Sequence, residues 1–295
     1  MLEGLQFREF DANGVRIRAA VGGSGPPLLL LHGNPQTLAM WHQVAPVLAS
    51  HFTVVATDLR GYGDSGKPAS SADHATYSKR AMALDQIEVM RQLGYDEFHV
   101  AGHDRGARVA YRMALDHPAK VRRLAVLDII PTGEAFRRAD MKLAMGYWHW
   151  FFLAQPNGLP ELLIGKDPDE YWFRHTAREP KPRDFFHPEA LADYLRCFRD
   201  PQTRHAICED YRAAATVDYA LDEADFASGR KITCPLLVLW GRKGLLEQWY
   251  DVLSVWRGWA VDVQGFGLDC GHYLAEEKAA ETSAALRSFF GVNEG

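Results

Sequence analysis

The chain has 295 residues but only four cysteines, and these show no C-x-x-C spacing. That scarcity argues against a disulfide framework and favours buried, unreactive thiols at Cys197, Cys208, Cys234 and Cys270. The histidines form no H-E-x-x-H motif, so no metal is expected. Apolar runs such as residues 27–31 are far too short to cross a bilayer.

The charges are nearly balanced and scattered. The formal net charge is −5, and Lys and Arg form no cluster, which argues against nucleic acid or a membrane surface as a partner. The first five residues lack the charged and then apolar pattern of a secretory signal. We therefore expect a cytoplasmic protein, whose 47% hydrophobic residues suffice for a sizeable core.

Short apolar runs alternate with helical patterns over most of the chain. Continuous apolar strands are typical of a parallel sheet buried on both faces. Helices are predicted at residues 77–93, followed by Gly94 as a C-terminal cap, and at 105–117, stopped by Pro118. The predicted strands cover residues 15–20, 28–31, 53–56, 98–101, 124–127 and 236–240.

The alternation stops after Asp128. Residues 132–217 are rich in aromatics, have a helical pattern and contain no strand pattern, and the β/α alternation resumes near residue 234. A helical insertion explains this arrangement, since loops at the carboxyl ends of parallel strands build sites in α/β folds. We expect an α/β core formed by residues 1–131 and 218–295, with a helical cap at 132–217.

The stretch from Val100 to Gly106, VAGHDRG, has the G-x-nucleophile-x-G pattern of a strained strand-to-helix turn. The side chain at its centre is Asp104, where such turns commonly carry a serine. A carboxylate there can attack a saturated carbon and form an alkyl ester, whereas a serine attacks acyl carbon. Asp104 is therefore the predicted nucleophile.

Three further motifs accompany this turn: HGNP at residues 32–35, DLRGYGDS at 58–65 and DCGH at 269–272. Together these stretches resemble the α/β-hydrolase superfamily over nearly the whole chain. The resemblance implies an α/β fold, with a mostly parallel sheet, helices on both faces and an inserted helical cap. It makes His272 the general base, although a surface histidine is the alternative, and it makes His32 and His103 packed supports.

The acid that supports His272 can be chosen by position. Many superfamily members carry it after a late strand, but there this chain has WGRKG at residues 240–244, with Gly244 where the carboxylate would be. Asp128 ends an earlier strand, the location used by some dehalogenases of the superfamily. We interpret Asp128 as the acid that orients His272 and stabilises its imidazolium, rather than as a simple turn residue.

Arg105 and Arg108 lie three apart at the start of the helix that follows Asp104, so their side chains share one face. Two guanidinium groups can clamp a substrate carboxylate and offset its repulsion by Asp104, which is several kcal/mol at about 4 Å. The alternative is that one of them, Arg108 in particular, pairs with a surface carboxylate. We favour the clamp and an anionic substrate.

Four further segments of the sequence indicate a resemblance to one family within the superfamily. The segments GHDRGAR (102–108), LDIIP (127–131), YWHW (147–150) and DYR (210–212) resemble the haloacetate dehalogenases, specifically the fluoroacetate dehalogenases. The resemblance implies that His149, Trp150 and Tyr211 hold the departing halide, since three N–H or O–H donors suit fluoride in a dry pocket. An apolar cap core is the alternative. Because neighbours on a regular helix diverge, His149 and Trp150 can meet one halide only if it lies between them or the backbone is irregular.

Asn34 departs from the haloacetate pattern, which often has a bulky aromatic there, and resembles the haloalkane dehalogenases instead. Those enzymes follow the nucleophile with tryptophan, whereas this chain has Arg105, which favours a carboxylated substrate. The backbone N–H groups of Asn34 and Arg105 are expected to form the oxyanion hole.

These residues predict hydrolytic dehalogenation of short 2-haloacids, with fluoroacetate and water giving glycolate and fluoride. Asp104 would attack C2, and water activated by His272 would hydrolyse the ester, so no cofactor is expected. Two alternatives stay open: an epoxide hydrolase, which uses the same nucleophile but normally needs two cap tyrosines, and a ligand-sensing relative without turnover. Family analogy alone suggests a homodimer.

Overall fold

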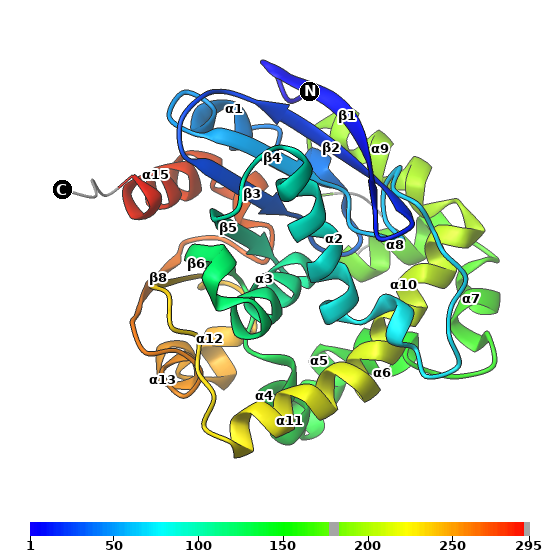
Figure 1. The fold of residues 1–295 in the computed structure, drawn as a ribbon. Helices are drawn as coiled ribbons and strands as arrows, with labels where there is room; N and C mark the ends of the chain where they lie inside the picture. Colours follow the sequence, from blue (N-terminus) through cyan, green and yellow to red (C-terminus); the bar gives the residue numbers. More distant parts are fainter. Residues whose placement is uncertain (177–182, 292–295) are drawn as a thin grey trace.

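The structure is a computed structural model that describes residues 1–176 and 183–291 (Figure 1). In this range eight strands form one sheet in the order β1-β2-β4-β3-β5-β6-β7-β8. β2 pairs antiparallel with β1 and β4, and all other neighbours pair parallel. The strands are β1 (Leu5–Ala12), β2 (Val15–Gly22), β3 (Pro27–Leu31), β4 (Thr53–Thr57), β5 (Phe98–His103), β6 (Val121–Leu127), β7 (Leu236–Gly241) and β8 (Val263–Leu268).

Helices fall into two groups. Those outside the β6–β7 connection are α1 (Ala45–Leu48), α2 (Lys79–Gln92), α3 (Arg105–Asp116), α12 (Leu246–Trp249), α13 (Val252–Arg257), α14 (Leu274–Glu277) and α15 (Ala279–Phe290), with short 3-10 turns η1 (Leu38–Trp41), η2 (Ala75–Tyr77) and η3 (Pro118–Lys120). The connection itself holds α4 (Thr132–Arg137), α5 (Met141–Gly146), α6 (Trp148–Leu153), α7 (Leu159–Ile164), α8 (Pro168–Thr176), α9 (Pro188–Phe198), α10 (Pro201–Ala213), the π turn η4 (Ala214–Asp218) and α11 (Tyr219–Ala227).

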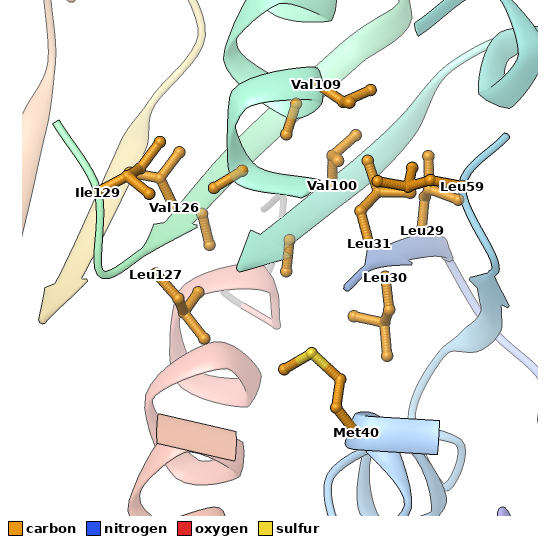
Figure 2. Packing of buried hydrophobic residues seen from close by; sticks show 14 of the residues in the cluster. Leu29, Leu30, Leu31, Met40, Leu59, Val100, Val109, Val126, Leu127 and Ile129 are labelled. Carbon is orange, nitrogen blue, oxygen red and sulfur yellow. The ribbon is translucent and has the colours of Figure 1, made fainter. Parts of the chain in front are cut away.

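The central strand β3 shows why the sheet is covered on both faces. Leu29, Leu30 and Leu31 are all fully buried. Leu29 and Leu31 point to the side of α3, where Val109 lies, and Leu30 points to the opposite side, toward Met40 of η1 (Figure 2). Successive side chains of a strand alternate between faces, so a strand covered on both sides is apolar at every position.

All six strands predicted from the sequence form, and so do the two predicted helices, as α2 and α3. Gly94 adopts a φ of +88°, as a C-terminal cap requires. β1 and β8 were not predicted. β1 exposes most of its side chains at the sheet edge, and β8 contains Gly265 because the Val238 carbonyl oxygen leaves no room there for a β-carbon. Neither strand has the continuous apolar pattern of a buried strand.

The helices between β6 and β7 form one connected block. α10 packs along α6 and α11 packs along α4 (Figure 1). α11 lies beyond the expected cap end at residue 217, and its Asp222 accepts a hydrogen bond from Gly133 N of α4 at 2.7 Å. The helical run therefore ends at Ala227, while the division into core and cap stays a prediction. No helix of the described residues is both long and apolar enough to cross a membrane.

The cysteines are all free thiols. Cys197, Cys208 and Cys270 are buried as predicted, whereas Cys234 is only half buried, which corrects the prediction for that residue. Burial raises the pKa of each thiol, to about 11 at Cys234 and about 12 at Cys197 and Cys270. Thiolate, the reactive form, is therefore scarce at neutral pH.

Candidate active site

Asp104 lies at the turn between β5 and α3, with φ 45° and ψ −114°. A residue other than glycine in this region is strained, and its surroundings must hold it there. A β-carbon on Gly102 would lie 2.6 Å from Ala107 N, and one on Gly106 would press on the carbonyl oxygen of His32. The two glycines thus permit the tight strand-to-helix turn that the G-x-D-x-G pattern predicts.

The Asp104 side chain is buried but favours its charged form. Burial alone would raise its pKa, yet the positive charges of His272 and the two following arginines outweigh burial and lower the pKa below 3.8. The backbone N–H of Asn34 donates to Asp104 Oδ2 at 2.9 Å. One of the two amides predicted for the oxyanion hole therefore lies beside the Asp104 carboxylate, and the other, that of Arg105, is the first amide of α3.

Asp128 and His272 are 144 positions apart in sequence and meet beside this turn. His272 Nδ1 lies 2.6 Å from Asp128 Oδ2, and Gly241 N donates to Asp128 Oδ1 at 2.9 Å. Burial alone would lower the pKa of His272, but the hydrogen bond and charge of Asp128 outweigh burial and raise the pKa above 6.5. This pairing fixes the imidazole tautomer with Nε2 left to accept a proton.

Two further histidines support the turn. His103 Nε2 donates to the carbonyl oxygen of His272 at 2.7 Å, and His32 Nε2 accepts from Leu59 N at 3.1 Å. Burial lowers the pKa of His32 to about 4 and that of His103 to about 3. Both rings are therefore neutral at physiological pH, as expected of packed supports.

Arg105 is fully buried behind the cavity rather than on its wall. Its guanidinium donates to both carboxylate oxygens of Asp210, and its Cζ lies 3.9 Å from the ring centroid of Tyr211. Nη1 has no hydrogen-bond partner among the residues that the structure describes. Arg105 is therefore held in an ion pair with Asp210 behind the cavity, and its part in a carboxylate clamp stays a prediction.

Arg108, the other residue predicted for the clamp, lines the cavity together with Asp104. Its Nη1 donates to Ile130 O and Thr132 Oγ1, both at 3.0 Å, and its Nε has no hydrogen-bond partner in the described residues. No carboxylate of residues 1–176 or 183–291 lies within ion-pair distance, so the predicted alternative of a surface pair does not occur there. Burial, with the charge of Arg105, lowers the pKa of Arg108.

The backbone is irregular just before His149 and Trp150. α5 ends at Gly146 and α6 begins at Trp148, with Tyr147 between them at φ −108° and ψ 40°. His149 and Trp150 both line the cavity of Asp104. The break precedes the pair, and His149 and Trp150 are consecutive residues of α6, so a shared halide would have to lie between their two directions.

Tyr211 of α10 completes the predicted donor set. Its ring centroid lies 5.9 Å from that of His149 and 6.4 Å from that of Trp150. Asn34 Nδ2 donates to Tyr211 Oη at 3.4 Å, so Asn34 contacts both this hydroxyl and, through its backbone, the Asp104 carboxylate. The three side chains predicted as halide donors therefore line the same cavity as Asp104.

The cavity has a volume of about 350 Å³ and is partly open to solvent. Two of its wall residues were not predicted: Tyr147, which stacks on Trp150 with 6.1 Å between centroids, and His175 of α8, whose ring lies 4.4 Å from that of His149. Tyr147 adjoins a recognised motif and could have been included. His175 stands in no motif, and only the packing of α8 brings it here.

A buried ionic cluster behind the cavity was also missed. Asp210 pairs with Lys79 as well as Arg105, and Tyr62 Oη donates to it at 2.7 Å. Burial alone would raise the pKa of Asp210, but the two cations outweigh it and lower the pKa well below 3.8. The position of Asp210 directly before Tyr211 was the available signal, whereas Lys79 had none.

Comparisons with known proteins show which family and which relatives the chain is similar to. The family described as alpha/beta hydrolase fold matches residues 26–279. A fluoroacetate dehalogenase of Burkholderia sp. is 48% identical, with 98% of this chain and 95% of the relative covered. A soluble epoxide hydrolase of Corynebacterium sp. (strain C12) is 36% identical, with 94% of each covered. A crystal structure of a Nostoc sp PCC 7120 protein, provisionally assigned to the alpha/beta hydrolases, has a TM-score of 0.95 and 54% identity, covering 99% of this chain and 100% of the other.

Proposed function

The chain belongs to the alpha/beta hydrolase fold family, and from that premise we propose that it is a hydrolytic dehalogenase of short 2-haloacids. The leading case is fluoroacetate plus water giving glycolate and fluoride. The family match confirms the fold class predicted from the sequence, and the 48% identity to a fluoroacetate dehalogenase confirms the resemblance.

The observation that carries the proposal is the buried guanidinium of Arg108 on the cavity wall. Only 3% of Arg108 is exposed, and no described carboxylate pairs with it. The Asp104 carboxylate compensates part of the Arg108 charge without a direct ion pair, and an anion bound in the cavity would offset more of the cost of burying this cation. A substrate carboxylate at Arg108 would stand next to Asp104, so that C2 of a haloacid faces the nucleophile.

In the first step Arg108 holds the substrate carboxylate, and Arg105 adds its positive charge from behind the cavity wall. Asp104 attacks C2 in line with the carbon–halogen bond, and the bonding electrons leave with the halide. The halide is received by three donors that line the cavity: His149, Trp150 and Tyr211. The product of this step is an alkyl ester on Asp104.

In the second step water adds to the carbonyl carbon of that ester. His272, oriented by Asp128, takes a proton from the water, and the backbone N–H groups of Asn34 and Arg105 stabilise the oxyanion. The C–O bond to the substrate then breaks, and the hydroxyacid leaves. Asp104 keeps one oxygen atom from water, and this scheme uses no cofactor.

Two rival functions are less well supported. An epoxide hydrolase finds a precedent in the Corynebacterium relative, but an uncharged epoxide would leave Arg108 without a counter-ion. A ligand-sensing relative would lack part of the triad, whereas Asp104, Asp128 and His272 lie together here.

Isotope labelling tests the covalent scheme. In a single turnover with chloroacetate in H₂¹⁸O, we expect the label in Asp104 and not in glycolate. Label in the first-turnover glycolate would contradict the ester. Halide release from fluoroacetate and chloroacetate, compared with styrene oxide turnover, separates the dehalogenase from an ordinary epoxide hydrolase.

By family analogy we further propose a cytoplasmic homodimer, and sedimentation of the pure protein tests the dimer.

A further inference from the structure

The loop that carries His272 is held at two points by one carboxylate. Glu277 Oε2 accepts a hydrogen bond from Gly271 N at 2.7 Å, and Glu277 Oε1 accepts one from Tyr273 N at 3.0 Å. The carboxylate thus binds the residues immediately before and after His272. Hydrogen bonds to a charged acceptor are about twice as strong as those between neutral groups. The position of the His272 backbone therefore depends on the Glu277 side chain.

Glycine at position 271 leaves room for this carboxylate. A β-carbon on Gly271 would lie 2.9 Å from Glu277 Oε1 and 3.2 Å from Oε2. The backbone of Gly271 lies outside the left-handed region, so its conformation does not require glycine. The absence of a side chain at this position therefore lets Glu277 reach both N–H groups.

The short helix α14, which carries Glu277, is itself anchored. Its buried Glu276 accepts hydrogen bonds from Tyr194 Oη of α9, at 3.0 Å, and from Gln36 Nε2. Gln36 follows closely on Asn34, whose backbone N–H is one of the amides predicted for the oxyanion hole. Because α14 is fixed to these two segments, the Glu277 carboxylate can set the position of the His272 loop.

The charge of Glu277 acts mainly after Asp104 has reacted. Burial lowers the pKa of His272, whereas the carboxylates of Asp128, Asp104 and Glu277 raise it. Once Asp104 is an ester it carries no charge. Of these three carboxylates, only Asp128 and Glu277 then stabilise the imidazolium that forms when His272 takes a proton from water. Glu277 also lines the cavity that contains His272 and Asp104.

We propose that Glu277 is a positioning residue for hydrolysis of the ester, which it promotes by holding the backbone on both sides of His272 and by placing a negative charge near the imidazolium. This inference rests on the proposed function for the two half-reactions. The first, attack of Asp104 on C2, does not use His272 and is therefore independent of Glu277.

The decisive experiment measures the two half-reactions separately with chloroacetate. Rapid-quench measurement of the first chloride released per chain gives the rate of attack by Asp104. Decay of the carboxymethyl ester, followed by intact-protein mass spectrometry in single turnovers, gives the rate of hydrolysis. Glu277→Ala should slow hydrolysis about 10²-fold, the effect of a catalytic group displaced by about 1 Å, and change the first step less than about threefold. A normal first step also shows that the variant folds.

The matched control is Glu281→Ala. It removes an exposed glutamate of the next helix, α15, which pairs with Lys278 at 3.0 Å. This variant should leave both rates unchanged, so that a general effect of losing a negative charge near the end of the chain is distinguished from the contact with the His272 loop.

Gly271→Ala separates position from charge. The added methyl group displaces the flexible end of Glu277 but keeps its charge, and hydrolysis should slow about tenfold or more. Combined with Glu277→Ala, it should add little to the loss caused by Glu277→Ala alone, because both changes act on one contact.

Three results overturn this inference alone when the wild type releases chloride. They are hydrolysis by Glu277→Ala at the wild-type rate, equal slowing of both half-reactions in that variant, and losses that simply add in the double variant. If the wild type releases no chloride from chloroacetate, the proposed dehalogenase itself is wrong.

Discussion

A β-carbon built on Gly244 lies 3.9 Å from Asp128 Oδ2, the oxygen that pairs with His272. The two positions in sequence at which a hydrolase of this fold can carry its acid therefore converge on one place in space. Gly244 is not at positive φ, and the nearest atom to such a β-carbon is Gly241 O at 3.1 Å. A short side chain can fit there with a small shift.

This convergence predicts that the acid can be moved. Asp128→Ala should lower turnover by about 10⁴-fold, since it removes the group that orients the base. Asp128→Ala combined with Gly244→Asp should recover roughly ten- to a hundredfold of that loss. Halide release from chloroacetate measures both variants.

The matched control is Asp128→Ala with Gly244→Asn, which has the same shape without the charge. If the Asn and Asp versions recover equal activity, packing rather than charge explains the effect. If neither recovers any, the two positions are not interchangeable in this chain.

His272 should be needed for the second step only. His272→Ala leaves Asp104 and Arg108 intact, so the ester should form and then accumulate because no base activates water. Intact-protein mass spectrometry after incubation with chloroacetate should show one added carboxymethyl group per chain. If the variant has a native circular dichroism spectrum but stays unmodified, His272 is not the base that activates water for hydrolysis of the ester.

The pH dependence of ester hydrolysis should follow the pKa of His272. The base acts as neutral imidazole, and Asp128 raises the pKa, so the rate should fall as pH drops through a value above 6.5. Without the charge of Asp128, burial would lower the pKa of His272, so Asp128→Asn should move the fall in rate to lower pH and also lower the rate. The rate of ester hydrolysis, measured in single turnovers across pH, tests this. If the fall in rate stays at the same pH, a group other than His272 titrates.

Arg108 should select for charge. Arg108→Met should lower kcat/KM for chloroacetate by about 10²- to 10³-fold, the effect of losing a buried partner of a charge. The neutral analogue chloroacetamide provides the comparison, and its kcat/KM should change by less than about tenfold because it lacks the charge that Arg108 binds. Equal losses for the two substrates would indicate that Arg108 holds the fold of the site rather than the carboxylate.

Much of the fold and of the candidate site could be predicted from local sequence patterns. A buried parallel strand is recognised by a continuous apolar run, and the turn at Asp104 by the glycines two positions on either side of it. Both patterns lie within a few residues, so the central strands and this turn could be predicted. Gly244 was informative as an absence, because a missing carboxylate pointed to Asp128. β1 and β8 were not predicted, because β1 is an exposed edge strand and β8 is rich in glycine, so neither has an apolar run.

Contacts between segments far apart in the sequence could not be predicted from it. The sequence placed Arg105 and Arg108 on one face of a helix, but only the fold distinguishes them, since Asp210 of α10 turns one into a buried ion pair and leaves the other on the cavity wall. His175 and Lys79 likewise reach their places through helices that pack from distant segments. No local spacing encodes such contacts.

The buried cluster of Asp210, Lys79 and Arg105 should stabilise the protein as a unit. Asp210→Ala leaves two buried cations without their carboxylate and should lower the free energy of unfolding by about 3–5 kcal/mol. Glu88→Ala breaks the solvent-exposed pair with Arg91 and should change the free energy of unfolding far less. Urea unfolding of both variants measures the contrast. Lys79 keeps Asp218 as a second partner at 3.9 Å, so adding Lys79→Met to Asp210→Ala removes a partly compensated cation and should return only part of the lost stability. Because Asp210 also holds Arg105, the double variant should keep a raised KM for chloroacetate even where its stability recovers, and recovery of both together would show that Asp210 serves packing alone.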